Sequence, residues 1–165
     1  MTVEEVYTNA FDARLVAWTE IGDTPYLNDS DTNYIYTGTS LRTEGDWTFP
    51  NSAGSGTINS VKLRLESLIN PAGVGFVEVY VWDGSAWVLA GNVGLGEDYA
   101  WFELDVSAIL NTWAKINGAE VYVRYILVEP PGYGYVRRLT RKVDYTPLAV
   151  VAKREIMDGF VLITG

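Results

Sequence analysis

The chain has 165 residues, enough for one domain with a substantial core, and its hydrophobic content of 48% argues against disorder. Its formal net charge of −9 argues against general binding to nucleic acid or to anionic membranes. The chain contains no cysteine and no histidine, which excludes disulfides, thiolate chemistry and a Ser/His/Asp triad and removes the commonest general base.

The first third of the chain predicts short strands separated by turns. Residues 1–14 are weakly amphipathic and indicate a short strand or an arm, and LVAWTEI at 15–21 indicates a strand. The N-terminus shows no secretory or transmembrane segment. A loop of four oxygen-bearing side chains at 28–31 precedes a strand that begins at Tyr34, and Pro50 stops a further short strand.

The clearest pattern in the chain is FVEVYVWDGSAW at residues 76–87. Valines alternate here with aromatic and charged residues, so a strand would have one aliphatic face and one aromatic, mixed face. Asp83-Gly84 then interrupts the run, and a second apolar run starts at Trp87. Asp-Gly between two apolar runs is a strong hairpin signal, because glycine tolerates the positive φ of a tight reversal. The preceding stretch, 58–68, alternates in the same way and indicates a half-exposed strand.

The second half continues this alternation. WFELDV at 101–106 indicates a strand, and 107–113 indicates one or two helical turns with Ser107 as a cap. Further strands are expected in the segments 119–128, 133–143 (with its basic residues on an open face), 143–151 (an edge or bulge because of Pro147) and 160–164.

So many one-faced strands predict a single all-β domain over 1–165, in which two antiparallel sheets form a sandwich. A closed barrel is the alternative architecture. The N-terminal arm, about 1–14, and a C-terminal extension, about 152–165, are expected to serve assembly.

The order of DTNYIYT, INSVKLRLES, VEVYVWDGSAW, WFELDVSAIL, EVYVRYI and VDYTPLAV resembles jelly-roll modules over about residues 31–150. Such modules occur as non-catalytic carbohydrate-binding domains and as surface domains of phage, virus and archaeal proteins. The resemblance implies a jelly-roll β-sandwich with minor helical turns. It also implies that a structural calcium could be present, with Asp144 of the VDY segment as the one family-like ligand.

Five aromatic residues are candidates for ligand binding, because sugar rings stack on flat aromatic faces: Tyr80, Trp82, Trp87, Tyr99 and Trp101. A hairpin that presents Tyr80 and Trp82 on one face, with Trp87 across from them, would make such a platform. The alternative is burial in the core, which is the commoner fate of aromatic side chains in a sandwich.

Two groups of acids are candidates for other chemistry. Asp29 and Asp31, with Asp144, offer the hard oxygen ligands that suit calcium, whereas the alternative is a solvated turn. Glu103 and Asp105 share a strand face at about 7 Å, but the same alternation places both on a solvated face. We therefore expect a protein that is not an enzyme and that needs no cofactor.

Basic and apolar segments near the C-terminus are candidates for self-association. A basic strand would meet an acidic partner, phosphate or solvent, and acidic and basic segments of different copies would attract each other. The apolar segment FVLIT would complete a neighbour's sheet by edge addition. The residues concerned are Arg137, Arg138, Arg141, Phe160, Val161, Leu162 and Ile163.

The first hypothesis for function is a non-enzymatic structural component of an assembled particle, such as a virion head, tail or fibre, located at the virion or extracellular surface. Its partners would be further copies of the chain. The alternative is a carbohydrate-binding module that binds a glycan, with or without a structural calcium. Neither hypothesis involves nucleic acid or membrane.

Overall fold

The computed structural model describes residues 1–15, 19–21, 34–38, 42–70, 74–129 and 133–148. Its elements in chain order are β1 (Thr2–Tyr7), β2 (Ala10–Leu15), β3 (Thr19–Ile21), β4 (Tyr34–Gly38), β5 (Arg42–Thr48), β6 (Thr57–Asn70), β7 (Val74–Trp82), β8 (Trp87–Gly94), β9 (Ala100–Asp105), α1 (Trp113–Asn117), β10 (Glu120–Glu129) and β11 (Tyr133–Thr146). The expected strand at 160–164 lies outside the described residues.

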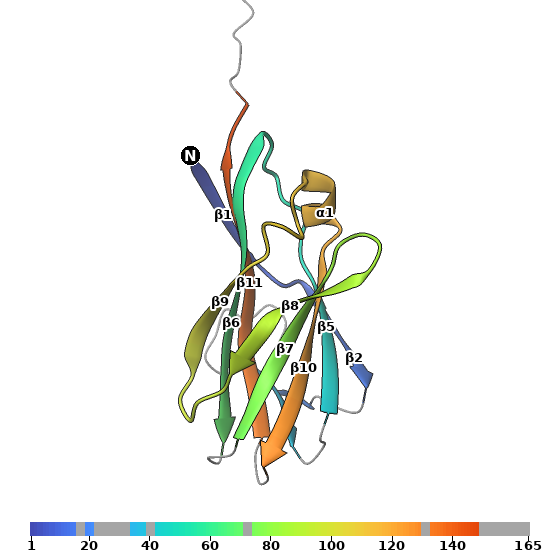
Figure 1. Ribbon diagram of the computed structural model, residues 1–165, viewed down its shortest axis with the longest axis vertical. Helices are drawn as coiled ribbons and strands as arrows, with labels where there is room; N and C mark the ends of the chain where they lie inside the picture. The colour runs from blue at the N-terminus through green and yellow to red at the C-terminus, as the bar shows by residue number, and fades with distance from the viewer. Residues whose placement is uncertain (16–18, 22–33, 39–41, 71–73, 130–132, 149–165) are drawn as a thin grey trace, which may run out of the picture.

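Two antiparallel sheets face each other (Figure 1). The first sheet has the order β3-β4-β11-β6-β9, and the second has the order β2-β5-β10-β7-β8. From β4 to β11 the chain alternates between the sheets at every connection except the β7–β8 hairpin. This arrangement of eight strands in two four-stranded layers is a jelly roll, which confirms the predicted fold class and excludes the closed barrel.

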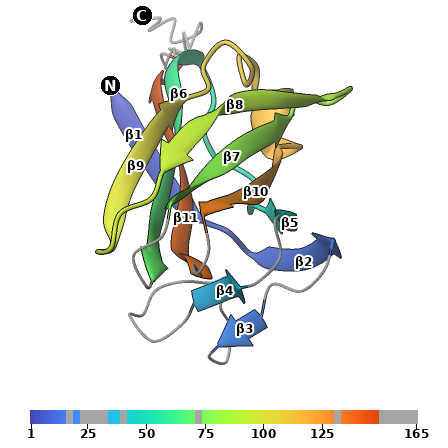
Figure 2. The ribbon, with the colours of Figure 1, turned by 60° about the horizontal axis from the view of Figure 1, so that its bottom comes forward.

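The N-terminal residues belong to these sheets. β1 pairs with β11 from Thr2↔Tyr145 to Tyr7↔Thr140, next to the segment of β11 that pairs with β4. β2 adds to the outer edge of β5 (Figure 2). The expected arm is therefore built into both layers of the domain, and its expected part in assembly stays a prediction.

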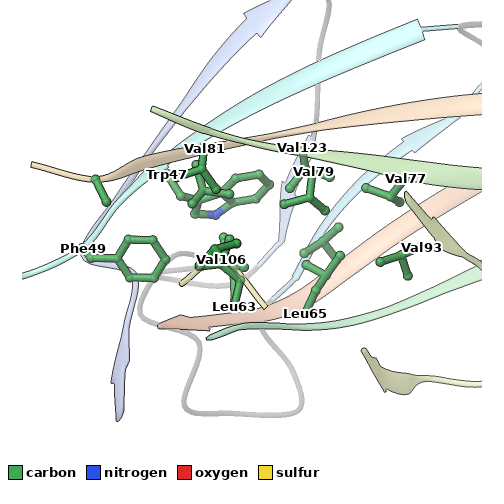
Figure 3. Close-up of a cluster of buried hydrophobic side chains, with 14 of the residues drawn as sticks. Trp47, Phe49, Leu63, Leu65, Val77, Val79, Val81, Val93, Val106 and Val123 are labelled. Carbon is green, nitrogen blue, oxygen red and sulfur yellow. The ribbon is translucent and has the colours of Figure 1, made fainter. Parts of the chain in front are cut away.

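The core lies between the inner faces of the sheets (Figure 3). Val77, Val79 and Val81 of β7 point inward, as the alternation predicts, and meet residues of β6 and β11 from the opposite layer. Each of these side chains is at most 2% exposed: Val77, Val79, Val81, Val61, Leu63, Leu65, Leu139 and Val143. At about 25 cal/mol per Å² of buried apolar surface, this burial is the main stabilising contribution to the fold.

The helix begins later than the sequence indicates. Residues 106–110 form a turn, in which the amide of Leu110 donates to the carbonyl of Val106 at 2.9 Å. α1 starts only at Trp113, because Thr112 is the N-cap and its Oγ1 accepts from the Lys115 amide at 3.2 Å. Within the described residues no helix is long and apolar enough to cross a bilayer.

The last described strand corrects two expectations. β11 is one continuous strand that ends directly before Pro147, where two strands had been expected. The expected open basic face is wrong for Arg141, which is fully buried. Spacing by two puts Arg141 on the inner face with Leu139 and Val143, because side chains alternate across a strand.

Candidate functional site

The β7–β8 hairpin ends in a turn that the side chain of Asp83 organises. Trp82 and Trp87 are the last cross-strand pair before the turn. Asp83 Oδ1 accepts from the amide of Ser85 at 2.8 Å, from its Oγ at 2.8 Å and from the amide of Ala86 at 2.9 Å. Gly84 has φ of 99°, a conformation that favours glycine. These features confirm the hairpin predicted from Asp83-Gly84.

Four aromatic rings gather beside this turn on the outer face of the second sheet. We call Tyr80, Trp82, Trp87 and Tyr122 the hairpin aromatic cluster. The rings of Tyr80 and Tyr122 stack at 4.4 Å with an interplanar angle of 9°. Trp87 meets Tyr122 edge-on at 4.8 Å, and Trp82 lies 5.6 Å from Trp87 with a tilt of 57°. Three of the five predicted aromatic residues therefore lie together, as the sequence predicted.

A charged pair completes this face. Arg124 Nη1 donates to Glu78 Oε2 and to the phenol oxygen of Tyr80, both at 3.0 Å, and Nη2 donates to the phenol oxygen of Tyr122 at 3.0 Å. The guanidinium also lies over the ring of Tyr80, 4.9 Å from its centroid. The Tyr80 hydroxyl in turn donates to Glu78. Arg124 thus fixes both tyrosines with directed, charge-assisted bonds.

The sequence interpretation missed Tyr122, Arg124 and Glu78. The signal was present in EVYVRYILV, where alternation puts Tyr122 and Arg124 on the face opposite the buried Val121 and Val123. What the sequence did not show is that β10 lies next to β7, in the register Tyr122↔Tyr80 and Arg124↔Glu78.

The other two predicted aromatic residues lie elsewhere. Trp101 belongs to β9 of the first sheet, where it is 38% exposed. The guanidinium carbon of Arg64 lies over its ring, 4.7 Å from the ring centroid. The guanidinium carbon of Arg137 lies over the ring of Tyr99, 4.2 Å from the ring centroid. Tyr99 and Trp101 therefore lie apart from the hairpin aromatic cluster, because β8 and β9 belong to different sheets.

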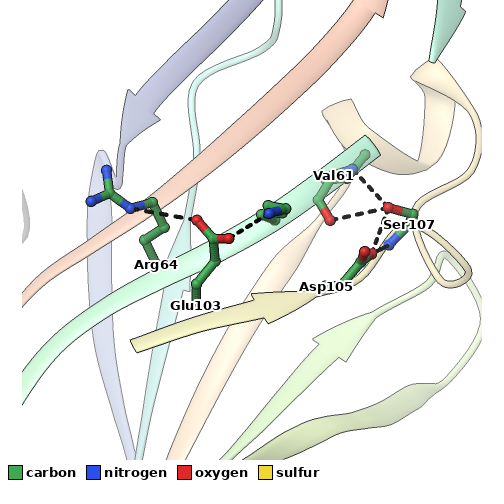
Figure 4. Close-up of polar contacts among 6 residues, drawn as sticks. Val61, Arg64, Glu103, Asp105 and Ser107 are labelled. Carbon is green, nitrogen blue, oxygen red and sulfur yellow. Dashed lines mark hydrogen bonds and ion pairs between the residues drawn. The ribbon is translucent and has the colours of Figure 1, made fainter. Parts of the chain in front are cut away.

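The two carboxylates considered for catalysis lie on the outer face of the first sheet (Figure 4). A hydrogen bond from Lys62 lowers the pKa of Glu103, and hydrogen bonds from the Ser107 side chain and amide lower the pKa of Asp105. Both side chains are exposed. Each carboxylate is held ionised by its partner, so neither is tuned to release or take a proton near neutral pH.

The predicted metal ligands are only partly described. Asp29 and Asp31 lie outside the described residues. Asp144 lies in β11 and accepts from Asn59 Nδ2 at 3.3 Å. Within the described part of the chain, no group of three or more acidic side chains is placed to hold a metal ion.

The basic residues proposed for assembly have partners inside the domain. Arg137 and Arg138 both contact the carboxylate of Glu66. Arg137 Nε lies 2.9 Å from Glu66 Oε2, and Arg138 Nε lies 3.5 Å from the same oxygen. The buried Arg141 donates to the carbonyls of Ile116 and Pro50. Burial lowers the pKa of Arg141 to about 10. The apolar residues 160–163 lie outside the described residues.

No family model and no curated protein matches this chain. Among solved structures it is similar in fold to a family 61 carbohydrate-binding module in complex with beta-1,4-galactotriose, at 9% identity and a TM-score of 0.48, over 80% of this chain and 86% of that one. A family 29 carbohydrate-binding module matches at 11% identity and a TM-score of 0.49, over 86% and 90% of the two chains.

A third match is the CBM36-1 domain of a multidomain xylanase from the hindgut metagenome of Trinervitermes trinervoides, at 8% identity and a TM-score of 0.49, over 89% and 100%. All three structures are carbohydrate-binding modules, and none is a virion or phage surface domain. At these identities the likeness concerns the fold, and it assigns no residue of this chain to a ligand.

Proposed function

We propose that this protein is a non-catalytic module that binds a glycan on the outer face of its second sheet. The observation that carries the proposal is the hairpin aromatic cluster, whose four rings lie together outside the core. Sugar rings present flat C–H faces that pack on aromatic rings, while their hydroxyls need hydrogen-bond partners. The cluster and the adjoining Arg124–Glu78 pair offer both.

The members of the cluster have different roles in this proposal. Tyr80 and Tyr122 stack on each other, and Tyr122 is only 6% exposed. We therefore assign this pair to holding the site in place and not to contact with the glycan. Trp82 and Trp87 are only partly buried and lie nearest the turn, and they supply the stacking surface. Arg124 and Glu78 supply polar atoms beside it.

The charge of the protein favours a neutral glycan over an acidic one. Arg124 and Glu78 neutralise each other at 3.0 Å, and the whole chain carries a net charge of −9. A polyanionic glycan would therefore meet no excess of positive charge among the described side chains of this face and would be repelled at longer range. We propose neutral oligosaccharides or polysaccharides as the ligand class.

The particle hypothesis has less support. Of the residues expected to serve assembly, 160–163 lie outside the described residues, Arg141 is buried, and Arg137 and Arg138 contact Glu66 within the domain. No described contact favours it over glycan binding. Light scattering across a range of salt concentrations tests self-association separately from glycan binding.

The test of the proposed function is a screen of neutral glycans followed by calorimetry on the ligands that bind. We expect Trp82→Ala and Trp87→Ala each to weaken binding about 30-fold, the equivalent of removing a central contact worth about 2 kcal/mol. Trp101→Ala is the matched control, because it removes an exposed tryptophan from the opposite sheet. Equal losses in all three variants, or no binding by the unaltered protein to any neutral glycan, would refute the proposal.

A further inference from the structure

The turn beside the hairpin aromatic cluster is closed by a side chain. The amide of Asp83 donates to the carbonyl of Ala86 at 3.0 Å, which makes one main-chain bond across the turn. The return bond, from the amide of Ala86, goes to the carboxylate of Asp83 at 2.9 Å. The same oxygen also takes both donors of Ser85. One oxygen therefore holds two successive amides of the turn.

The carboxylate also links the hairpin to α1. Asp83 Oδ2 lies 3.5 Å from Lys115 Nζ, and α1 is itself held to the core by the buried Ile116. Bonds from Ala86 and Ser85 hold the pKa of the Asp83 carboxyl far below its usual range. The carboxylate stays ionised at neutral and mildly acidic pH, so the turn keeps its acceptor under those conditions.

This turn lies between the two tryptophans of the proposed site. Trp82 directly precedes Asp83, and Trp87 directly follows Ala86. A different turn would change the twist of the last cross-strand pair, because turn geometry sets the twist and register of a hairpin. The observed tilt of 57° between the two indoles belongs to this particular turn.

We infer that Asp83 is a positioning residue for the proposed glycan site, because its carboxylate fixes the hairpin turn that sets the angle between Trp82 and Trp87. This inference rests on the proposed function, since it assigns the two indoles to ligand contact. Asp83 need not touch the glycan. Its effect on affinity is exerted through the orientation of the two rings.

Circular dichroism tests the orientation without any ligand. Two indoles 5.6 Å apart and tilted couple their transitions and give a paired positive and negative band whose size depends on their angle. Asp83→Ala removes the only acceptor for the Ala86 amide described here, and we expect that band pair to shrink. Asp83→Asn keeps a side-chain oxygen that can accept the same amides, and we expect it to retain the signal.

Calorimetry then tests the consequence for binding. We expect Asp83→Ala to weaken glycan binding about fivefold, less than the loss of either indole, because both rings remain and only the angle between them changes, while Asp83→Asn stays within about twofold. Asp105→Ala is the matched control, because Asp105 accepts from the amide and Oγ of Ser107 in the same manner on the opposite sheet. We expect it to change neither the band pair nor the affinity.

The outcomes separate this inference from the proposed function. An unchanged band pair in Asp83→Ala overturns the inference, as does an equal loss of affinity in Asp105→Ala. If no neutral glycan binds the unaltered protein, the proposed function fails, while the band pair still decides whether Asp83 sets the indole angle. Should Asp83→Ala not fold, Asp83→Ser, which keeps one short acceptor, must show an intermediate band pair, and an unchanged one overturns the inference.

Discussion

Replacing Gly134 with alanine tests how closely the two sheets pack. Gly134 is buried in β11, and the ring of Tyr125 reaches it from β10 with no exposed surface of its own. A Cβ at position 134 would lie 2.7 Å from Tyr125 Cδ2 and 2.8 Å from Cε2. These are rigid ring atoms, and separations below 3 Å force the core to move.

We expect Gly134→Ala to lower the free energy of unfolding by about 2 kcal/mol, the middle of the range for overpacked cores. For a domain of this size the melting temperature should fall by about 6 °C. Thermal and urea unfolding followed by circular dichroism measure both quantities. The loss comes from sterics, because Gly134 shows no positive φ that alanine would be unable to adopt.

Gly91→Ala is the matched control in β8. Its added Cβ would meet Leu104 Cδ2 at 2.9 Å, but that atom is the end of a flexible, partly buried side chain that can turn away. We expect a change within about 0.5 kcal/mol, because a strand glycine replaced without strain also gains from a less flexible unfolded chain.

A double-mutant cycle completes this test. Tyr125→Leu removes the ring that Gly134→Ala would strike, so the alanine should cost clearly less in that background. If Gly134→Ala behaved like Gly91→Ala, or cost the same with leucine at 125, the cross-sandwich contact described here would be wrong.

Three further predictions concern buried and charged groups. Tyr125→Phe should raise stability by about 1 kcal/mol in urea unfolding, because the buried Tyr125 hydroxyl has no hydrogen-bond partner among the described residues and burial raises its pKa to about 12; a loss of stability would show that the hydroxyl is paired. Arg141→Met should lower stability by about 3 kcal/mol, since it leaves the carbonyls of Ile116 and Pro50 unpaired inside the domain; an unchanged urea midpoint would contradict this. Finally, the folded-state pKa values of Glu103 and Asp105 are lowered, so their stabilisation is present above the unfolded values of about 4 and disappears as pH falls through the lower folded values. The double variant Glu103→Gln, Asp105→Asn should therefore lose less melting temperature than the unaltered protein between pH 5 and strong acid, and equal losses would refute the assignment.

The fold could be predicted because strand alternation is a local property. Val77, Val79 and Val81 alone define an inner and an outer face for β7, and Asp83-Gly84 defines its reversal. Repeating this reasoning over the chain gives a sandwich of one-faced strands. It places Tyr80 and Trp82 on the same outer face without knowledge of any partner strand.

The rest of the site depends on contacts between distant segments. Tyr122 and Tyr80 are 42 residues apart in the sequence (122 − 80), and they meet only because β10 pairs with β7. Trp87 and Trp101 both lie in alternating strands, but β8 and β9 fall in different sheets. Local periodicity assigns a face to each strand and does not say which strands share that face.

Arg141 shows a different limit. Its alternation with Leu139 and Val143 indicates the inner face, whereas its charge favours solvent. The structure places it inside, where the carbonyls of Ile116 and Pro50 receive its donors. A buried cation becomes acceptable where main-chain oxygens converge on it, and these oxygens come from α1 and from the segment after β5, whose positions the sequence alone did not give.

The proposed glycan face is tested most directly by locating the ligand on the protein. Nuclear magnetic resonance of the indole N–H groups, assigned by single tryptophan substitutions, reports each ring during titration with a neutral glycan that binds. We predict that the signals of Trp82 and Trp87 shift with saturation, while those of Trp101 and the structural Trp113, whose Nε1 donates to the Gly56 carbonyl at 2.8 Å, stay in place. Shifts confined to Trp101 would place the ligand on the opposite sheet and contradict the account.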